Sequence, residues 1–367
     1  MIILSSGSGN YIWSNGKKYS YFGGNNYLGL TSHPSVCDAT IESVKKYGVN
    51  FSASRITTGT ADIHLELESA LSDFKGKQDA VVFASGYQGN GILLEILKSS
   101  YSVIFMDEFA HPSIYSCMPR EIQQIRLYRH CDASHLASLI EGYNDGCPLV
   151  ITDGVFALTG EIAPLDMIYQ PIQKKNGILI VDDAHATGIL GDTGKGTPEH
   201  FNLHGYENIF QTETMSKALG SYGGFIAGHK NLTDLIRKNS ATYQSSTALP
   251  PPIAAASLAA LKIIKNNPGL RSEVLRKAGY LRKAIISMGF DTTNGITPVI
   301  PIKMPSEVKA KSLSSYMEQK GIIAPFMNYP YRQKMHIIRV TVSANHTEDQ
   351  MDEFLRSLKE WRHHEAM

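Results

Sequence analysis

The chain has 367 residues, of which 43% are hydrophobic, and this is enough to bury the cores of two domains. Its 35 lysines and arginines nearly balance its 34 aspartates and glutamates, so no net charge attracts it to nucleic acid or to an anionic membrane. The start, MIILSSGSGNYIW, lacks the pattern of a signal peptide, and no apolar run approaches the roughly 20 residues that cross a bilayer. The four cysteines form no CxxC pair, which favours a reduced, cytoplasmic protein without a metal site or a disulfide framework.

The predicted elements fall into three regions. Residues 1–45 form an N-terminal arm with a short strand or turn at NNYLGL. Residues 46–280 alternate helix-like patterns with short apolar runs, which predicts a mostly parallel α/β sheet between helices. The predicted strands lie at 80–85, 102–107, 148–153, 177–183, 208–214 and 223–228. The last of them follows its predecessor so closely that we expect it to pair antiparallel.

Residues 281–367 follow a different pattern. Strand-like stretches at 297–304 and 336–344 alternate with helix-like stretches at 306–321 and 347–364. This order predicts a smaller C-terminal α+β domain. Two long helices, at 251–267 and 271–289, are expected to lead from the large sheet into it.

Polar residues follow several of the predicted strands, where ligands of such sheets bind. Asp182 and Asp183 end one apolar run, and His185 follows in the turn. These carboxylates could bind a metal, act as a base or hold a cationic ring nitrogen; they could equally cap the next helix. After another run, Gly86 and Tyr87 open a helix whose free N–H groups favour a phosphate, although an ordinary turn glycine explains the pattern as well.

Two further strand ends carry residues whose side chains could take part in catalysis. His111 precedes a proline and could stack on a ring or transfer protons, whereas most loop histidines do neither. Lys217, in TETMSKALG with Thr214, could form a Schiff base in a partly desolvated site, whereas most lysines are surface charges. The stretch GDTGKGTPE is not a P-loop, because Ile189 stands where the first glycine is needed and Gly196 follows Lys195.

The order of these signals is more specific than any one of them, and with it the sequence resembles the α-oxoamine synthases. These are fold-type I pyridoxal-phosphate transferases. The matching stretches cover roughly residues 20 to 350, and they are NNYLGLTSHP, SRITTGTADIHLELESALSDFKG, SGYQGN, DEFAHPSI, VDDAHATGILGDTGKG, TETMSKALGSYGG, SSTALPPP and IIRVTVSANHTEDQM. Size and general pattern favour the 8-amino-7-oxononanoate synthase branch.

The resemblance implies catalytic roles around pyridoxal 5'-phosphate. Lys217 would bind the cofactor as a Schiff base and move the α-proton of the substrate. Asp182 would pair with the pyridine nitrogen, which makes the ring an electron sink. His111 would stack on the ring, and His185 would contact its hydroxyl group.

The resemblance also implies binding roles. Gly86, Tyr87 and Thr214 would bind the phosphate. Ser246 and Thr247 would reach the phosphate of the neighbouring subunit, so a homodimer with shared active sites is expected. Arg339 would hold the substrate carboxylate by a bidentate pair, and Asn25 would touch the substrate from the arm.

The implied reaction is a decarboxylative condensation of a small L-amino acid with an acyl-CoA or acyl-carrier thioester, which gives an α-amino ketone. Two departures from the family pattern bear on the substrates. Ala157 stands in GVFALTG where the family usually has a serine. The segment before NNYLGL is short, so we expect part of the acyl-chain or CoA tunnel to be absent or built differently.

Other classes remain open at this stage. An aminotransferase or racemase on the same fold would act without a thioester. A secondary-metabolite or signal-molecule synthase fits the family as well as a biosynthetic enzyme does. A non-catalytic subunit is disfavoured because such partners typically lack the lysine. A metal enzyme using Asp182, Asp183 and His185 is the remaining competitor.

Overall fold

The structure is a computed structural model, and it describes residues 2–119, 124–327 and 335–366. The chain forms two compact units. We call Pro34–Phe156 with Ile162–Asn266 the sheet unit, and Met1–His33, Ala157–Glu161 and Asn267–Met367 the terminal unit. The domain boundaries expected from the sequence stay a prediction, because compactness alone does not test whether a segment folds by itself.

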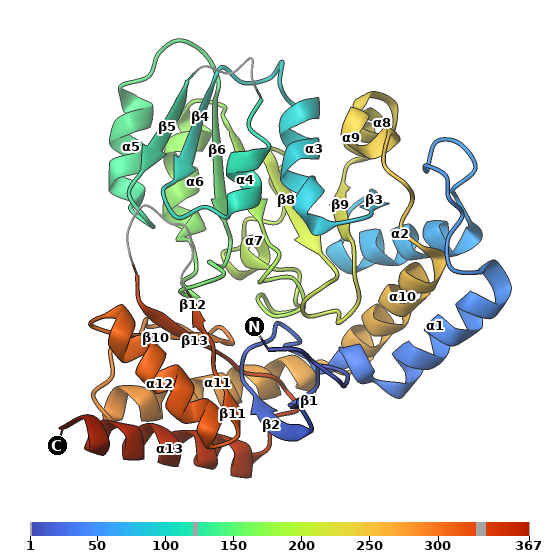
Figure 1. The fold of residues 1–367 in the computed structure, drawn as a ribbon. Coiled ribbons are helices and arrows are strands. Elements are labelled where there is room, and N and C mark those ends of the chain that lie inside the picture. The colour runs from blue at the N-terminus through green and yellow to red at the C-terminus, as the bar shows by residue number, and fades with distance from the viewer. Residues whose placement is uncertain (1, 120–123, 328–334, 367) are drawn as a thin grey trace. The chain divides into compact units, whose positions relative to one another are not determined.

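The sheet unit is built on a seven-stranded sheet with the order β3-β9-β8-β7-β6-β4-β5 (Figure 1). The strands are β3 (Asp79–Phe83), β4 (Val103–Asp107), β5 (Ile125–Tyr128), β6 (Pro148–Asp153), β7 (Ile178–Asp182), β8 (Ile209–Thr214) and β9 (Gly224–Gly228). Only β9 runs antiparallel to its neighbours, which confirms the predicted mostly parallel sheet and its reversed last strand. The sequence analysis missed β5, an edge strand whose residues are mostly exposed or half-buried and therefore give little apolar signal.

Alternating side chains of the strands enter two separate apolar cores, because successive residues of a strand point to opposite faces. In β4, Ile104 and Met106 join the core beneath α3 (Gly89–Ile96) and α8 (Lys230–Asn239). Val103 and Phe105 join the core beneath α5 (Ala133–Glu141) and α6 (Leu165–Lys174). Figure 1 shows α5 and α6 on one face of the sheet and α3 on the other. Side chains that follow one another at a strand end therefore enter different surroundings.

The remaining helices of the sheet unit include the predicted α10. They are α1 (Pro34–Tyr47), α2 (Asp62–Lys75), α4 (Pro112–Ser116), α7 (Thr197–His200), α9 (Ala241–Gln244), α10 (Pro251–Asn266) and the short 3-10 helix η2 (Gly86–Gln88). Both α1 and α2 pack on α10. Its buried residues include Ala254, Ala255 and Ala256, whose small side chains allow a close approach.

The terminal unit holds two small sheets and three long helices. One sheet has the order β10-β13-β12, and the other pairs the hairpin β1-β2 with β11. The elements are β1 (Tyr11–Ser14), β2 (Lys17–Tyr21), η1 (Leu30–Ser32), α11 (Gly269–Ser287), β10 (Val299–Lys303), α12 (Glu307–Gln319), β11 (Ile322–Ile323), β12 (Phe326–Met327), β13 (Ile337–Thr341) and α13 (Glu348–Ala366). The predicted strands and helices of this region are confirmed. The hairpin was missed, although its turn, Asn15-Gly16 with φ of 49° and 73°, is a strong hairpin signal.

Across residues 2–119, 124–327 and 335–366, no helix has both the length and the apolar composition that a membrane crossing requires.

Candidate active site

A cavity of about 180 Å³ lies in the sheet unit, where residues that follow β3, β4, β7 and β8 meet. This is the edge at which mostly parallel sheets bind ligands. Seven residues singled out from the sequence line it, and these are Gly86, Tyr87, His111, Asp182, His185, Thr214 and Lys217. Ser85, Ser113, Asp153, Ala184 and Ser216 complete the described lining. The fold thus gathers into one cavity residues that lie up to 132 positions apart, from Ser85 to Lys217.

Lys217 lies in the loop that joins β8 to β9. The backbone N–H of Met215 donates to the carbonyl of Gly223 at 2.9 Å, and the N–H of Gly220 donates to the carbonyl of Lys217 at 2.9 Å. Gly223 has φ of +95°, and a Cβ there would lie 2.7 Å from the Leu249 side chain, so the loop favours glycine at this point. These bonds close the loop and hold the half-buried lysine at the cavity.

The Asp182 carboxylate is held in place by Asn90, a residue that the sequence analysis did not assign. Asn90, fully buried on α3, donates from Nδ2 to Asp182 Oδ2 at 2.7 Å. Its Oδ1 accepts from the Thr212 hydroxyl at 2.8 Å, and the N–H of Ala184 donates to Asp182 Oδ1 at 3.2 Å. The available signal was one amide in the short helix GNGILLEI, whose only other polar side chain is Glu95. A buried carboxylate fixed in this way is suited to pairing with a cationic group.

His111 is the N-cap residue of α4 and is fixed by its neighbours. Its Nδ1 accepts from the N–H of Ser113 at 3.2 Å and lies 2.8 Å from the Ser113 hydroxyl. Because Nδ1 accepts a backbone N–H, a neutral ring carries its proton on Nε2. Burial lowers the pKa of His111; the Asp182 charge opposes this effect, and the Lys217 charge adds to it. The imidazole is therefore neutral near pH 7, which suits a ring that stacks on another ring.

Asp153 is a second residue that the sequence analysis did not assign. It ends β6 and accepts the backbone N–H of His111 at 2.9 Å. Burial, reinforced by the Asp182 charge, raises the pKa of Asp153 well above its ordinary value. Two carboxyl groups thus line the cavity, and their mutual repulsion favours one of them being protonated.

Gly86 and Thr214 make the tightest contact of the cavity wall. A Cβ on Gly86 would lie 2.7 Å from both Cβ and Oγ1 of Thr214, so only glycine fits here. The Thr214 hydroxyl donates to the carbonyl of Gly223 at 3.0 Å, and the N–H of Tyr87 donates to the Ser85 hydroxyl at 3.3 Å. Gly86 thus lines the cavity without a side chain where the sequence predicts a phosphate, and the phosphate roles of these residues stay predictions.

Asp183 belongs to a different environment from Asp182. Its carboxylate accepts from the N–H of Thr197 at 2.9 Å, from the Thr197 hydroxyl at 2.6 Å and from Gln211 at 2.7 Å. It is fully buried, and burial raises its pKa. Asp182 and His185 line the cavity, whereas Asp183 anchors the loop that precedes α7. A metal site would require the three residues to converge on one point, and they do not.

Ser246 and Thr247 are not among the described residues that line the cavity. The Ser246 hydroxyl accepts from Gln88 at 3.2 Å, and Thr247 forms a β-bridge with Ser54. Their predicted contact lies on a neighbouring subunit, so it stays a prediction.

The two predicted substrate-binding residues contact each other in the terminal unit. Arg339, in β13, donates to Asn25 Oδ1 at 2.8 Å, to Thr341 Oγ1 at 3.0 Å and to the carbonyl of Ala157 at 2.6 Å. These acceptors are all neutral. They orient a nearly buried guanidinium without neutralising its charge, so it remains able to pair with a carboxylate. Ala157, which stands where the family usually has a serine, contributes its backbone carbonyl to this arrangement.

Comparison with protein families gives a match over most of the sequence. Residues 17–358 match the model of the aminotransferase class I and II family. The chain belongs to this family. Within it, the chain is an α-oxoamine synthase, a pyridoxal-phosphate-dependent acyltransferase, as its relatives show.

Two relatives with assigned activities cover nearly the whole chain. An 8-amino-7-oxononanoate synthase of Thermoanaerobacter pseudethanolicus is 35% identical over 98% of this chain and 91% of its own length. The 8-amino-7-oxononanoate synthase 1 of Bacillus subtilis is 35% identical over 96% of this chain and 90% of its own length. Among solved structures, a serine palmitoyltransferase from S. paucimobilis with bound PLP–myriocin aldimine has a TM-score of 0.94 and 25% identity, and it covers 99% of this chain and 92% of that one.

The residues of this α-oxoamine synthase fit the family's cofactor. The cavity offers the amine of Lys217, a carboxylate fixed by Asn90, a neutral imidazole at His111 and a wall at Gly86 that has no room for a side chain. An amine, a carboxylate and an aromatic ring are the groups that pyridoxal phosphate requires for attachment, for pairing with its ring nitrogen and for stacking. The geometry of the chain therefore agrees with its family.

Proposed function

We propose that the chain catalyses the 8-amino-7-oxononanoate synthase reaction, in which L-alanine and a pimeloyl thioester condense with loss of CO2. The observation that carries this proposal is the convergence of Lys217, Asp182 and His111 on one cavity of the sheet unit. Relatives with that assigned activity, at 33% to 36% identity over 95% or more of the chain, direct the choice of substrates.

When bound, pyridoxal phosphate stabilises negative charge at the substrate Cα. Lys217 would hold the cofactor through Nζ, and its amine would remove the proton from the substrate Cα and later return one. Asp182, oriented by Asn90, keeps the ring nitrogen protonated. His111 stacks on the ring in its neutral form, and His185 donates to or accepts from the ring hydroxyl.

The binding groups fix the substrate and the phosphate. Arg339 pairs with the α-carboxylate of the amino acid, and Asn25, which already holds one guanidinium nitrogen, contacts the same substrate. Gly86, Tyr87 and Thr214 bind the phosphate through backbone N–H groups and a hydroxyl. Ala157 lacks the hydroxyl of the serine that the family usually has at this position. We expect this difference to influence the choice of amino acid or acyl chain.

Family membership also supports a proposal for the assembly and the location. We propose a homodimer in which Ser246 and Thr247 of each subunit reach the phosphate of the other. We also propose a cytoplasmic location, where free amino acids and acyl thioesters are available.

A second activity has a specific observation in its favour. The serine palmitoyltransferase has a TM-score of 0.94, whereas a solved 8-amino-7-oxononanoate synthase from Francisella tularensis has 0.81, with 25% identity, 95% coverage of this chain and 98% coverage of that one. An α-oxoamine synthase that takes serine and a longer acyl chain is therefore the alternative.

A titration of the purified holoprotein separates these activities. The visible absorption of the bound cofactor is followed while glycine, L-alanine, L-serine and L-threonine are added in turn, and then pimeloyl-CoA or palmitoyl-CoA. We expect a response to L-alanine, followed by release of free CoA and CO2 with pimeloyl-CoA. A response to L-serine with turnover of palmitoyl-CoA would establish the alternative. Keto acid formation, or α-proton exchange that ignores every thioester, would contradict both.

A further inference from the structure

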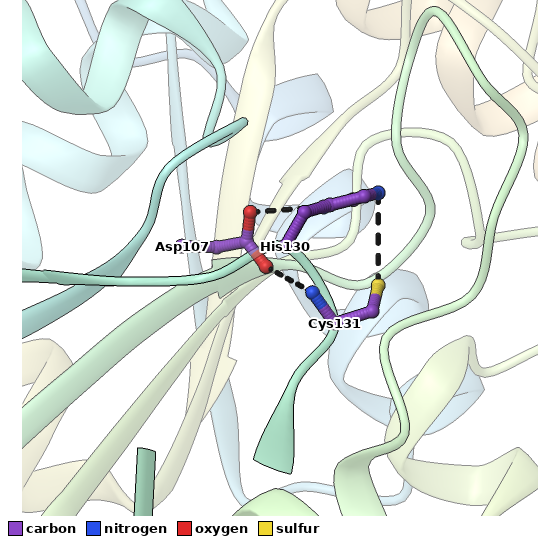
Figure 2. Close-up of side chains that lie close together, drawn as sticks. All are labelled: Asp107, His130 and Cys131. Atoms are coloured by element: carbon purple, nitrogen blue, oxygen red, sulfur yellow. Dashed lines mark hydrogen bonds and ion pairs between the residues drawn. The ribbon is translucent and has the colours of Figure 1, made fainter. Parts of the chain in front are cut away.

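A second group of reactive side chains lies in the sheet unit, outside the cavity lining. Asp107 ends β4, and His130 and Cys131 follow β5 (Figure 2). His130 Nδ1 lies 3.0 Å from Asp107 Oδ1, and His130 Nε2 lies 3.8 Å from Cys131 Sγ. The imidazole thus stands between a carboxylate and a thiol and presents one ring nitrogen to each.

The Asp107 carboxylate determines which nitrogen of His130 carries the proton. Asp107 is fully buried, and its Oδ1 also accepts the N–H of Phe109 at 2.8 Å, while its Oδ2 accepts the N–H of Cys131 at 2.9 Å. A carboxylate only accepts hydrogen bonds. It therefore accepts a hydrogen bond from Nδ1–H, which leaves Nε2 of the neutral ring as a base facing the thiol.

The His130 ring is held in this orientation by two aromatic side chains. Phe109 stacks on it with ring centroids 4.4 Å apart, and Phe156 meets it edge-on at 4.3 Å. The His130 side chain is only 14% exposed to solvent. Because the ring cannot turn away without losing these contacts, the base is positioned before any reaction begins.

Cys131 itself occupies a backbone conformation that disfavours most side chains. Its φ is +53°, and three of the four other described non-glycine residues with positive φ are asparagines, a residue that tolerates this region. A cysteine at this position has no conformational advantage. Its thiol, which is partly exposed, is therefore a feature that calls for a chemical explanation.

We propose that Cys131 is an activated thiol that forms mixed disulfides with low-molecular-weight disulfides. His130 Nε2 takes the thiol proton, and Asp107 stabilises the imidazolium ion that results. The thiolate attacks one sulfur of the disulfide, so a new S–S bond forms at Cys131, the original S–S bond breaks and one thiolate leaves. Cys131 is oxidised, half of the disulfide is reduced, and the imidazolium can protonate the leaving thiolate.

A metal site is the other chemistry that these three residues suggest. Both oxygens of Asp107 already accept N–H groups, so Asp107 acts behind His130 instead of facing an ion directly. That leaves Nε2 and Sγ as ligands, whereas structural zinc sites use four protein ligands and catalytic ones three. The geometry therefore favours thiol chemistry, and zinc binding becomes an outcome of the test.

The test measures which cysteine of the intact holoprotein reacts first. Oxidised glutathione is added at pH 6, and the modified peptides are quantified by mass spectrometry over time. Cys37, an exposed cysteine on α1, is the internal control. An ordinary thiol with a pKa of about 8.5 is less than about 1% ionised at pH 6. We expect Cys131 to react at least about 10-fold faster than Cys37, despite its lower exposure. Equal or slower modification of Cys131 would overturn the proposal.

Two variants and a pH profile identify the base. His130→Gln should slow the modification of Cys131 by about 10-fold or more and leave Cys37 unchanged, while Cys37→Ser should leave Cys131 unchanged. If His130→Gln does not fold, the pH dependence of the rate in the native protein decides, since the proposal requires a midpoint below that of Cys37. Zinc binding is measured on the native protein and on Cys131→Ser. If the native protein binds one zinc ion per chain and the variant binds none, the three residues form a metal site and the proposal of an activated thiol is wrong.

Discussion

At the carboxyl end of β7, Asp182 and Asp183 are neighbours in the chain, but they face different surroundings. Asp182 meets Asn90 on α3 and lines the cavity. Asp183 meets Thr197 and Gln211 on the other side of the sheet. The next strand repeats the arrangement: Thr212 and Thr214 belong to the cavity side, and Gln211 and Glu213 to the opposite side.

The two sides use similar side chains for different purposes. On the cavity side, Lys217 and Asp182 both line the cavity. On the opposite side, Lys75 Nζ lies 2.5 Å from Glu213 Oε1 and also donates to the carbonyl of Lys195. The charge of Lys75 is therefore paired inside the protein. A lysine and a carboxylate thus serve chemistry on one face and stability on the other, and strand alternation assigns the carboxylates to their faces. Substitutions on the two faces should therefore separate loss of activity from loss of stability.

The largest effect is expected on the cavity side, at Lys217. Lys217→Ala removes both the attachment point and the proton carrier, so turnover should fall by at least about 1,000-fold while the cofactor still binds without a covalent bond. The measurement combines turnover with the cofactor's absorption spectrum after dialysis. Lys238→Ala, an exposed lysine on α8, is the control and should retain full activity. Full activity in Lys217→Ala would rule out the proposed mechanism.

Asp182→Asn tests the carboxylate on the same side. The amide keeps the size of the side chain but cannot stabilise a proton on the ring nitrogen, so we expect turnover to fall by about 100- to 1,000-fold. Its one oxygen can still accept from Asn90, and only the longer bond from the N–H of Ala184 is lost, so the unfolding midpoint in urea should change little. A variant that loses stability but keeps its turnover number would reverse the assignment of the two faces.

On the opposite side, Glu213 should make stability depend on pH. Burial raises the pKa of Glu213 from 4.5 to about 7, although Lys75 acts in the opposite direction. The folded state therefore binds this proton more tightly than the unfolded state does, and stability falls as pH rises from about 4.5 to about 7. The expected loss in the free energy of unfolding is up to about 3 kcal/mol.

Urea unfolding at pH 5 and at pH 7.5 measures this dependence. Glu213→Gln resembles the protonated side chain, so it should flatten the difference between the two pH values. An unchanged difference in Glu213→Gln would show that other buried carboxyl groups, such as Asp153 and Asp183, cause it.

Asp183→Asn is the matched partner of Asp182→Asn and should have the smallest effect of the four. The amide can keep the bonds from Gln211 and from the N–H of Thr197, and only the bond to the Thr197 hydroxyl must be rearranged. We expect a loss of about 1–2 kcal/mol in the free energy of unfolding and a turnover within about 3-fold of the original. A 100-fold loss of turnover in a stable Asp183→Asn protein would place Asp183 in the reaction.

The sequence predicted most of this framework for local reasons. The runs VIFM and ILIV are apolar throughout because their strands are buried on both faces, and this pattern needs no knowledge of the fold. The edge strand β5 and the hairpin at Asn15-Gly16 were missed, the first because its apolar signal is weak and the second because its turn was not recognised. The polar residues after the strands were found because carboxyl ends of parallel strands share one edge.

What the sequence determined by itself is the set of chemical groups and the strands that carry them, since apolar runs, glycines and the order of Gly86, His111, Asp182 and Lys217 are local properties. The tertiary structure decided which carboxylate faces the cavity, and that Asn90 and Asp153 support the site from distant elements. It also decided that Asp107, His130 and Cys131 meet. These outcomes depend on the face of the sheet and on contacts between residues far apart in the chain, and a linear pattern does not record either.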